Sequence, residues 1–136
     1  MQFLDANIFV YAFVNPKRNL DAATIAAKKK AAAILQSQRE FCTSVVHVSE
    51  VANVIESISG QEQSTKIISA LLSTPNIKVL SVSAQDYLTA SQVSLQAKVG
   101  ANDALAYVLM KSNGVSEMLS FDRAFDKLPG IKRLEE

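Results

Sequence analysis

The sequence predicts an α/β fold in which a mostly parallel sheet of four to five strands is flanked by helices on both faces. Two observations support this prediction. Short apolar segments typical of strands alternate with longer segments of helical periodicity from one end of the chain to the other. Residues that end helices, namely Gly60, Pro75, Gly100 and Gly114, follow four of the helical segments.

The expected elements follow one another in the order β, α, α, β, α, α, β, α, α, β, β. Apolar composition predicts strands at residues 3–5, 39–44, 77–82, 115–121 and 131–134. Helical spacing predicts helices at residues 7–14, 20–38, 45–59, 61–75, 84–99 and 101–114, with Ser83 as the cap of the fifth. Residues 121–130 are expected to form a turn that includes one helical turn. The chain is therefore expected to be a single domain, residues 1–136.

The bulk composition narrows the class of protein. The chain is 49% hydrophobic and 20% charged, as is usual for a soluble globular domain. No apolar run approaches the roughly 20 residues that cross a bilayer, and Met1 directly precedes the first expected strand, so we expect a cytoplasmic protein without a membrane span. The single cysteine, Cys42, is expected to be a small buried core residue.

Four acidic residues are expected at one edge of the sheet, because parallel sheets place their ligand sites at the carboxyl ends of the strands. Asp5 ends the first strand, Asp122 follows the fourth, Asp103 opens a helix, and Glu50 lies in the helix after the second strand. Each has a simpler explanation when taken alone. The three aspartates could cap helices or occupy turns, and Glu50 could face solvent.

Taken together, the four carboxylates predict a metal centre, because acidic groups at close range raise one another's pKa unless cations neutralise them. Oxygen ligands without Cys or His favour Mg²⁺ or Mn²⁺. Two such ions about 3.5 to 4 Å apart can drive the attack of water on a phosphodiester. Other chemistries fit less well: the only histidine, His47, is expected to be a packed or half-exposed helix residue, and the chain has neither a nucleophile motif nor a phosphate-binding loop.

Four short motifs occur in a characteristic order: FLDANIFVYA, VSEVANVI, ANDALAY and SFDRAFDKLPGIKRL. With them the whole chain resembles PIN-domain ribonucleases, in particular the VapC-type toxins of prokaryotic toxin–antitoxin pairs. The resemblance implies a PIN-like three-layer sandwich and RNA cleavage that depends on Mg²⁺ or Mn²⁺. It also implies a cognate antitoxin as partner and a homodimeric toxin.

The resemblance further implies roles for individual residues. Asp5, Glu50, Asp103 and Asp122 match the family's metal ligands, and Asn7 and Ser120 match polar residues that accompany them. The chain departs from the family pattern after the fourth strand, where many relatives have a second acidic residue two positions on and this chain has Ala124. Asp126 is then either an outer ligand or, as its turn preference favours, a surface residue.

Setting the four acidic residues aside changes the net charge of the remainder from +1 to +5, which suits a phosphate backbone. The candidate RNA contacts are Lys17, Arg18, Lys28 to Lys30, Lys98 and Arg123. The run Lys28 to Lys30 lies in a helical pattern and is expected to form a solvated helix face, with nucleic-acid contact as the alternative. Two alternatives remain open at this stage: a non-catalytic PIN-like module that binds RNA or regulates, and a nuclease for single-stranded or flap DNA.

Overall fold

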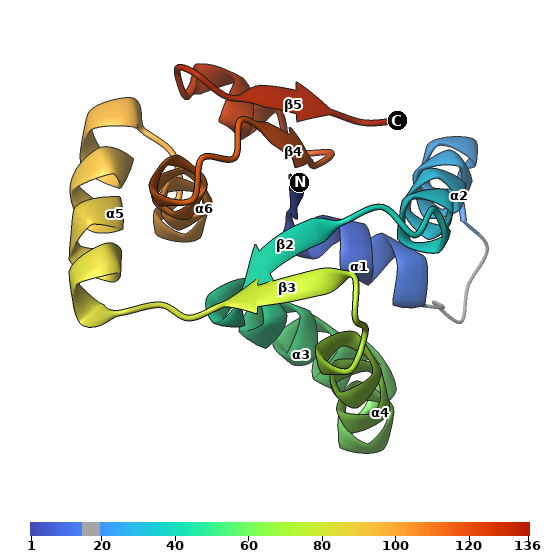
Figure 1. Ribbon diagram of the computed structural model, residues 1–136. Coiled ribbons are helices and arrows are strands. Elements are labelled where there is room, and N and C mark those ends of the chain that lie inside the picture. The colour runs from blue at the N-terminus through green and yellow to red at the C-terminus, as the bar shows by residue number, and fades with distance from the viewer. Residues whose placement is uncertain (15–19) are drawn as a thin grey trace.

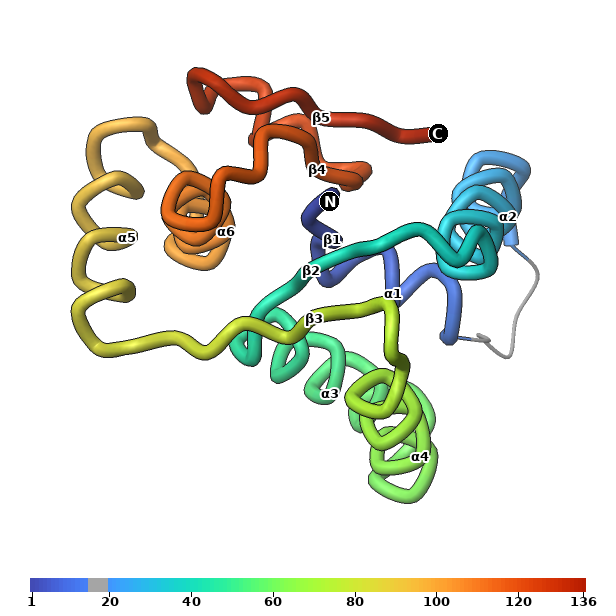
Figure 2. The backbone as a smooth tube through the Cα atoms, in the orientation of Figure 1, coloured from blue at the N-terminus to red at the C-terminus, as the bar shows by residue number. Residues whose placement is uncertain are grey.

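The computed structural model describes residues 1–14 and 20–136 and has the predicted α/β architecture (Figure 1). The sheet of the described residues has the order β3-β2-β1-β4-β5, and all neighbouring strands are parallel. The strand β1 is central, between β2 and β4 (Figure 2). The strands are β1 (Gln2–Leu4), β2 (Phe41–Ser44), β3 (Ile77–Leu80), β4 (Glu117–Leu119) and β5 (Lys132–Leu134).

Every predicted helix is present. The helices are α1 (Ala6–Phe13), α2 (Ala22–Gln36), α3 (Val45–Ser59), α4 (Gln61–Leu72), α5 (Ala84–Ala97) and α6 (Ala101–Ser112), and the predicted turn after β4 contains the 3₁₀ helix η1 (Arg123–Lys127). The helix α4 ends at Leu72 and not at Pro75, because a proline disfavours helical geometry at the residue before it. The strand β1 ends one residue early because Asp5 caps α1.

The sheet separates two apolar cores, and adjacent residues of a strand contribute to opposite ones. Phe3 and Met118 pack with α5 and α6, whereas their chain neighbours Leu4 and Leu119 pack with α1 to α4. This alternation follows from the two-residue period of a strand. The result is a three-layer arrangement with helices on both faces of the sheet (Figure 1), as predicted. Cys42 is buried in the first core, also as predicted.

The ends of two helices show how local sequence supports this packing. The N-cap of α3 is Ser44, whose hydroxyl accepts a hydrogen bond from His47 N at 3.2 Å. The C-terminal end of α1 is held by Lys28, whose ammonium group donates to the carbonyl oxygens of Tyr11, Ala12 and Val14 at 2.8 to 3.2 Å. The prediction of a solvated face for Lys28 is therefore wrong: a cation here satisfies carbonyl groups that the helix end leaves unpaired. Lys29 and Lys30 are exposed, as expected.

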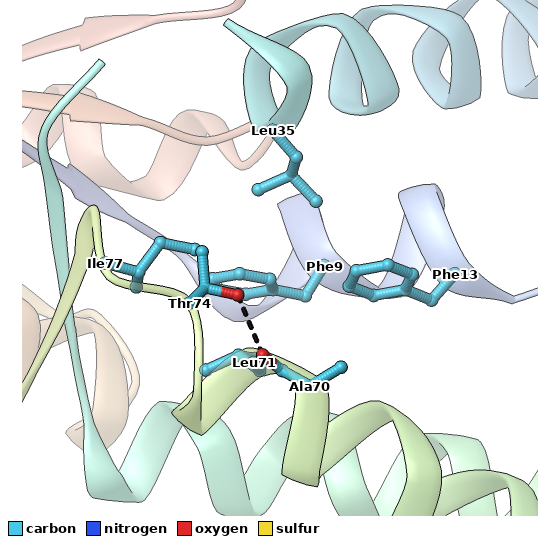
Figure 3. A pocket seen from close by; sticks show the side chains of 7 residues that line it. All are labelled: Phe9, Phe13, Leu35, Ala70, Leu71, Thr74 and Ile77. Carbon is cyan, nitrogen blue, oxygen red and sulfur yellow. Dashed lines mark hydrogen bonds between the residues drawn. The ribbon is translucent and has the colours of Figure 1, made fainter. Parts of the chain in front are cut away.

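One hollow lies away from the carboxyl edge of the sheet. An apolar hollow of about 150 Å³ lies where α1, α2 and α4 end and β3 begins, and its lining residues carry no ionisable group (Figure 3). Thr74 borders it and donates a hydrogen bond to Ala70 O at 2.7 Å, which extends the end of α4. None of the helices within residues 1–14 and 20–136 is long and apolar enough to cross a membrane.

Candidate active site

The candidate site lies at the point where the strand order reverses. From β1 the chain adds β2 and then β3 on one side, and it returns to add β4 and β5 on the other side of β1. The carboxyl ends of β1 and β4 therefore diverge into connections that leave in opposite directions, which opens a crevice in parallel sheets. Asp5 and Ser120 are the first residues after these two strands.

Asp5 is buried at this point, with 6% of its surface exposed. Its Oδ1 accepts a hydrogen bond from Ala6 N at 2.8 Å, and its Oδ2 accepts one from Ser120 Oγ at 2.7 Å. Burial raises the pKa of Asp5 to about 7; the Ser120 hydrogen bond opposes this, and the charges of Asp103 and Glu50 add to it. Within the described residues no basic side chain forms an ion pair with Asp5.

Ser120 joins the ends of β1 and β4. Besides donating to Asp5, its buried hydroxyl accepts hydrogen bonds from Asp122 N at 3.0 Å and from Asn7 Nδ2 at 3.3 Å. The amide oxygen of Asn7 accepts in turn from Phe121 N at 3.5 Å. Asn7 and Ser120 therefore hold the connection after β4 against the start of α1, and this connection carries Asp122.

Asp103 and Glu50 reach the same edge from α6 and α3. Asp103 is the third residue of α6, and burial raises its pKa to about 6, with further contributions from the charges of Asp122 and Glu50. The positive end of the α6 dipole and the Gly100 backbone partly stabilise this carboxylate. Glu50 is half-buried and accepts a hydrogen bond from Asn102 Nδ2.

The four carboxylates are therefore electrostatic neighbours, since Asp103 and Glu50 both act on Asp5, and Asp122 and Glu50 both act on Asp103. They do not form a closed set of ligands. In the part of the chain that the structure describes, no three Asp, Glu, His or Cys side chains meet closely enough to hold one metal ion. Donors that consist only of carboxylate oxygens nevertheless have the chemistry of an Mg²⁺ or Mn²⁺ site.

The remaining candidates among the described residues lie on the exposed segment after β4. Asp122 is exposed and caps η1 by accepting from Ala124 N at 2.9 Å. Asp126 is exposed and pairs with Arg133 at 2.9 Å, which places it on the surface, the alternative that its turn preference favoured. Arg123 is exposed at the start of η1. Lys17 and Arg18 lie outside the described residues.

His47 is packed beneath this edge and is not placed as a catalytic base. It is 1% exposed, its ring stacks edge-on against Phe3 with centroids 5.1 Å apart, and its Nδ1 is 2.6 Å from Ser44 Oγ. Burial lowers its pKa to about 4, with the backbone of Asn102 acting in the opposite direction, so the ring is neutral at physiological pH. Its Nε2 has no hydrogen-bond partner among the described residues.

Two residues near the site, Asn102 and Tyr87, were not predicted from the sequence. Asn102 donates to Glu50, and Tyr87 of α5 donates its hydroxyl proton to Asn102 Oδ1. Asn102 had a visible signal, because it directly precedes Asp103. Tyr87 had none, because only the packing of α5 against α6 brings it to Asn102.

Comparison with known protein families agrees with this geometry. A model of the PIN domain matches residues 3–131. The chain belongs to the PIN-domain family. PIN domains are nucleases as a family, and the match includes Asp5, Glu50, Asp103 and Asp122. A search of curated protein sequences found no match.

Solved structures with the same fold include toxins of toxin–antitoxin systems. This PIN domain superimposes on Mycobacterium tuberculosis VapC20, described as a sarcin-ricin loop cleaving toxin, with a TM-score of 0.78 and 16% identity over 96% of this chain and 97% of that one. It superimposes on DNA-bound VapBC from Salmonella typhimurium with a TM-score of 0.63 and 20% identity over 98% and 97%. It superimposes on a toxin–antitoxin complex from Klebsiella pneumoniae with a TM-score of 0.64 and 12% identity over 97% of this chain and 96% of that one. At these identities the likeness establishes the fold.

Proposed function

We propose that this PIN domain, residues 1–136, is an endoribonuclease that depends on Mg²⁺ or Mn²⁺ and acts as the VapC-type toxin of a toxin–antitoxin pair. The observation that carries the proposal is the buried Asp5 at the strand-order reversal. The charges of Asp103 and Glu50 add to its raised pKa, and no described basic group offsets it. A divalent cation would neutralise this concentration of negative charge.

The proposed ligands of the cation are Asp5, Glu50, Asp103 and Asp122. When bound, the ion would supply Lewis-acid activation for water and stabilise charge on the phosphodiester. The protein's own contribution is to hold the ligands in place. Ser120 fixes one oxygen of Asp5 and the backbone of Asp122, and Asn7 braces Ser120. The end of β1 leaves Asp5 little freedom, whereas Asp122 lies on an exposed segment and would adjust around the ion.

Binding of RNA is proposed to involve positive charge around this edge. Arg123 adjoins Asp122 in the chain and is exposed, and Lys17 and Arg18 are included for their positive charge alone. Loss of Arg123 should weaken RNA binding and reduce its salt dependence, because each phosphate contact releases counterions.

Partners and location are proposed on the family likeness. The similar structures from Salmonella typhimurium and Klebsiella pneumoniae are complexes of toxin and antitoxin, and we propose a cognate antitoxin for this chain. A homodimer is proposed as well, and three exposed leucines, Leu72, Leu88 and Leu95, are compatible with further association. A cytoplasmic location remains a prediction.

The test is cleavage of end-labelled RNA and of single-stranded and flap DNA of matched sequence, with Mn²⁺, with Mg²⁺ and with EDTA. We expect metal-dependent cleavage of RNA, and loss of that cleavage in Asp5→Asn. Asp21→Asn is the matched control, because Asp21 is an exposed cap of α2 away from the sheet. Cleavage that survives EDTA or Asp5→Asn would contradict the proposed mechanism.

Two other outcomes would favour the alternatives. Cleavage of DNA in preference to RNA would indicate a single-strand or flap nuclease. A folded protein that binds RNA, does not bind Mn²⁺ and does not cleave RNA would indicate a non-catalytic module. The second alternative keeps some support from Ala124, which replaces an acidic residue, and from the open arrangement of the four carboxylates.

A further inference from the structure

A chain of hydrogen bonds crosses three helices beside the acidic edge. The Tyr87 hydroxyl of α5 donates to Asn102 Oδ1 of α6, and Asn102 Nδ2 donates to Glu50 Oε1 of α3. These residues are 15 and 52 positions apart, so the connection exists only through tertiary packing.

The direction of this chain is fixed by its two ends. A carboxylate only accepts hydrogen bonds, so the amide nitrogen of Asn102 must face Glu50. The amide oxygen then faces Tyr87 and takes the phenolic proton. Each donor therefore meets an acceptor, and hydrogen bonds in such a series strengthen one another. The bond to Glu50 is also charge-assisted, which makes it the stronger kind.

Glu50 depends on this contact for its position. Its side chain is long and half-buried, and the bond from Asn102 is its one hydrogen bond within the described residues. Its Oε2 accepts none there and is free for another ligand. The Glu50 carboxylate lies close enough to Asp5 and Asp103 for the three charges to interact.

We propose that Asn102 and Tyr87 are positioning residues that hold the Glu50 carboxylate at the acidic edge for a divalent cation. This inference rests on the proposed function, because it assumes that the edge binds a metal ion. Neither residue would touch the ion or the RNA. Asn102 would orient one oxygen of Glu50 and leave the other for the cation, and Tyr87 would keep the Asn102 amide from turning over.

The test is the affinity of the full chain for Mn²⁺, measured by titration calorimetry without RNA. Partners in the outer coordination shell typically contribute 10- to 100-fold to metal affinity, so we expect Asn102→Ala to weaken binding about tenfold. Tyr87→Phe removes a single oxygen atom and should weaken binding about threefold, toward the lower limit of a hydrogen bond's worth. Both variants should keep the circular dichroism spectrum of the wild type.

Matched controls come from the same helices. Asn53→Ala removes an exposed amide of α3, and Tyr107→Phe removes a hydroxyl of α6 that has no hydrogen bond among the described residues. Both should bind Mn²⁺ as the wild type does. If Asn102→Ala failed to fold, Tyr87→Phe would still test the inference, because it preserves the ring and its packing.

A double-mutant cycle separates positioning from a general structural effect. Asn102→Ala should have no further effect on Mn²⁺ affinity in a Glu50→Gln background, since the group that it positions has lost its charge. The inference is overturned if Asn102→Ala leaves the affinity within twofold of wild type, tightens it, or weakens it equally in both backgrounds. Wild-type protein that bound no Mn²⁺ and cleaved no RNA would overturn the proposed function as well, and the two failures are thus distinguishable.

Discussion

Replacing Asp5 by asparagine should stabilise the metal-free protein at high pH. The pKa of Asp5 is about 7 in the folded protein, against an ordinary value of 3.8, so the folded state keeps this proton over a range in which the unfolded state has lost it. Between pH 4 and 7 the folded state binds more protons, and stability therefore falls as the pH rises, then levels off above pH 7. The fall contributed by Asp5 is about 4 kcal/mol at most, at about 1.4 kcal/mol per pH unit.

Asparagine has no charge and would avoid this loss of stability, but it would introduce a smaller loss of its own. Asp5 accepts from two donors, Ala6 N and Ser120 Oγ, whereas an amide has only one oxygen and must turn its NH₂ group toward one of them. A donor that faces a donor in a buried site costs about 1 to 3 kcal/mol. Asp5→Asn should therefore raise the free energy of unfolding at pH 8 by about 1 to 3 kcal/mol.

The assay is urea denaturation in EDTA at pH 4.5 and pH 8 for wild type and variant. The difference between the two proteins should change by about 3 kcal/mol between these pH values, in favour of the variant at pH 8. Asp21→Asn is the control, because the pKa of Asp21 is shifted in the opposite direction: hydrogen bonds to Thr24 lower it. Removing the Asp21 carboxylate should therefore not stabilise the protein at pH 8. Equal differences at pH 4.5 and pH 8 would refute the argument that burial makes Asp5 costly.

Three further predictions concern the same scaffold. Ser44→Ala should lower the free energy of unfolding by about 2 to 3 kcal/mol, because it removes the cap of α3 and leaves Nδ1 of the buried His47 unpaired. Ser83→Ala removes only an exposed cap and should lower it by about 1 kcal/mol. Equal losses of stability for the two variants in thermal melts would contradict this reasoning. Lys28→Met should cost about 1 kcal/mol through the end of α1, while Lys29→Met should be neutral, and a neutral result for both would show that the three carbonyl contacts do not matter. Mn²⁺ at about 100 times its dissociation constant should raise the free energy of unfolding of the wild type by about 2.7 kcal/mol at pH 8. Calorimetric melts should show a much smaller increase for Asp5→Asn.

Much of the fold could be predicted from local patterns. The helix α3 was expected at residues 45–59 and is found there, since its cap, its apolar spacing and the glycine at its end all lie within the segment. The strands β2 to β5 were expected to be longer than they are, and β1 is displaced by one residue. Their ends depend on which neighbours continue the ladder and on capping by Asp5, and neither is local information.

The individual side chains of the site were harder to predict. The placement of Asp5, Asp103 and Asp122 at element ends follows from strand and helix boundaries, which short-range sequence patterns mark. The ion pair of Asp126 with Arg133 and the contact of Lys28 with the end of α1 join segments that the pattern treats separately. Local propensity carries no information about such pairs.

The amino-acid sequence alone was enough to predict the alternation of strands and helices and the α/β class, and it singled out four acidic residues as candidates, because these depend on periodicity, caps and residue chemistry within short segments. Tertiary structure decided how the acidic residues are placed relative to one another. It buried Asp5 against Ser120, brought Tyr87 and Asn102 to Glu50, and kept the four carboxylates apart as neighbours that do not close on one point. The strand order made this possible, since it brings the ends of β1 and β4, more than a hundred residues apart, to the same edge of the sheet.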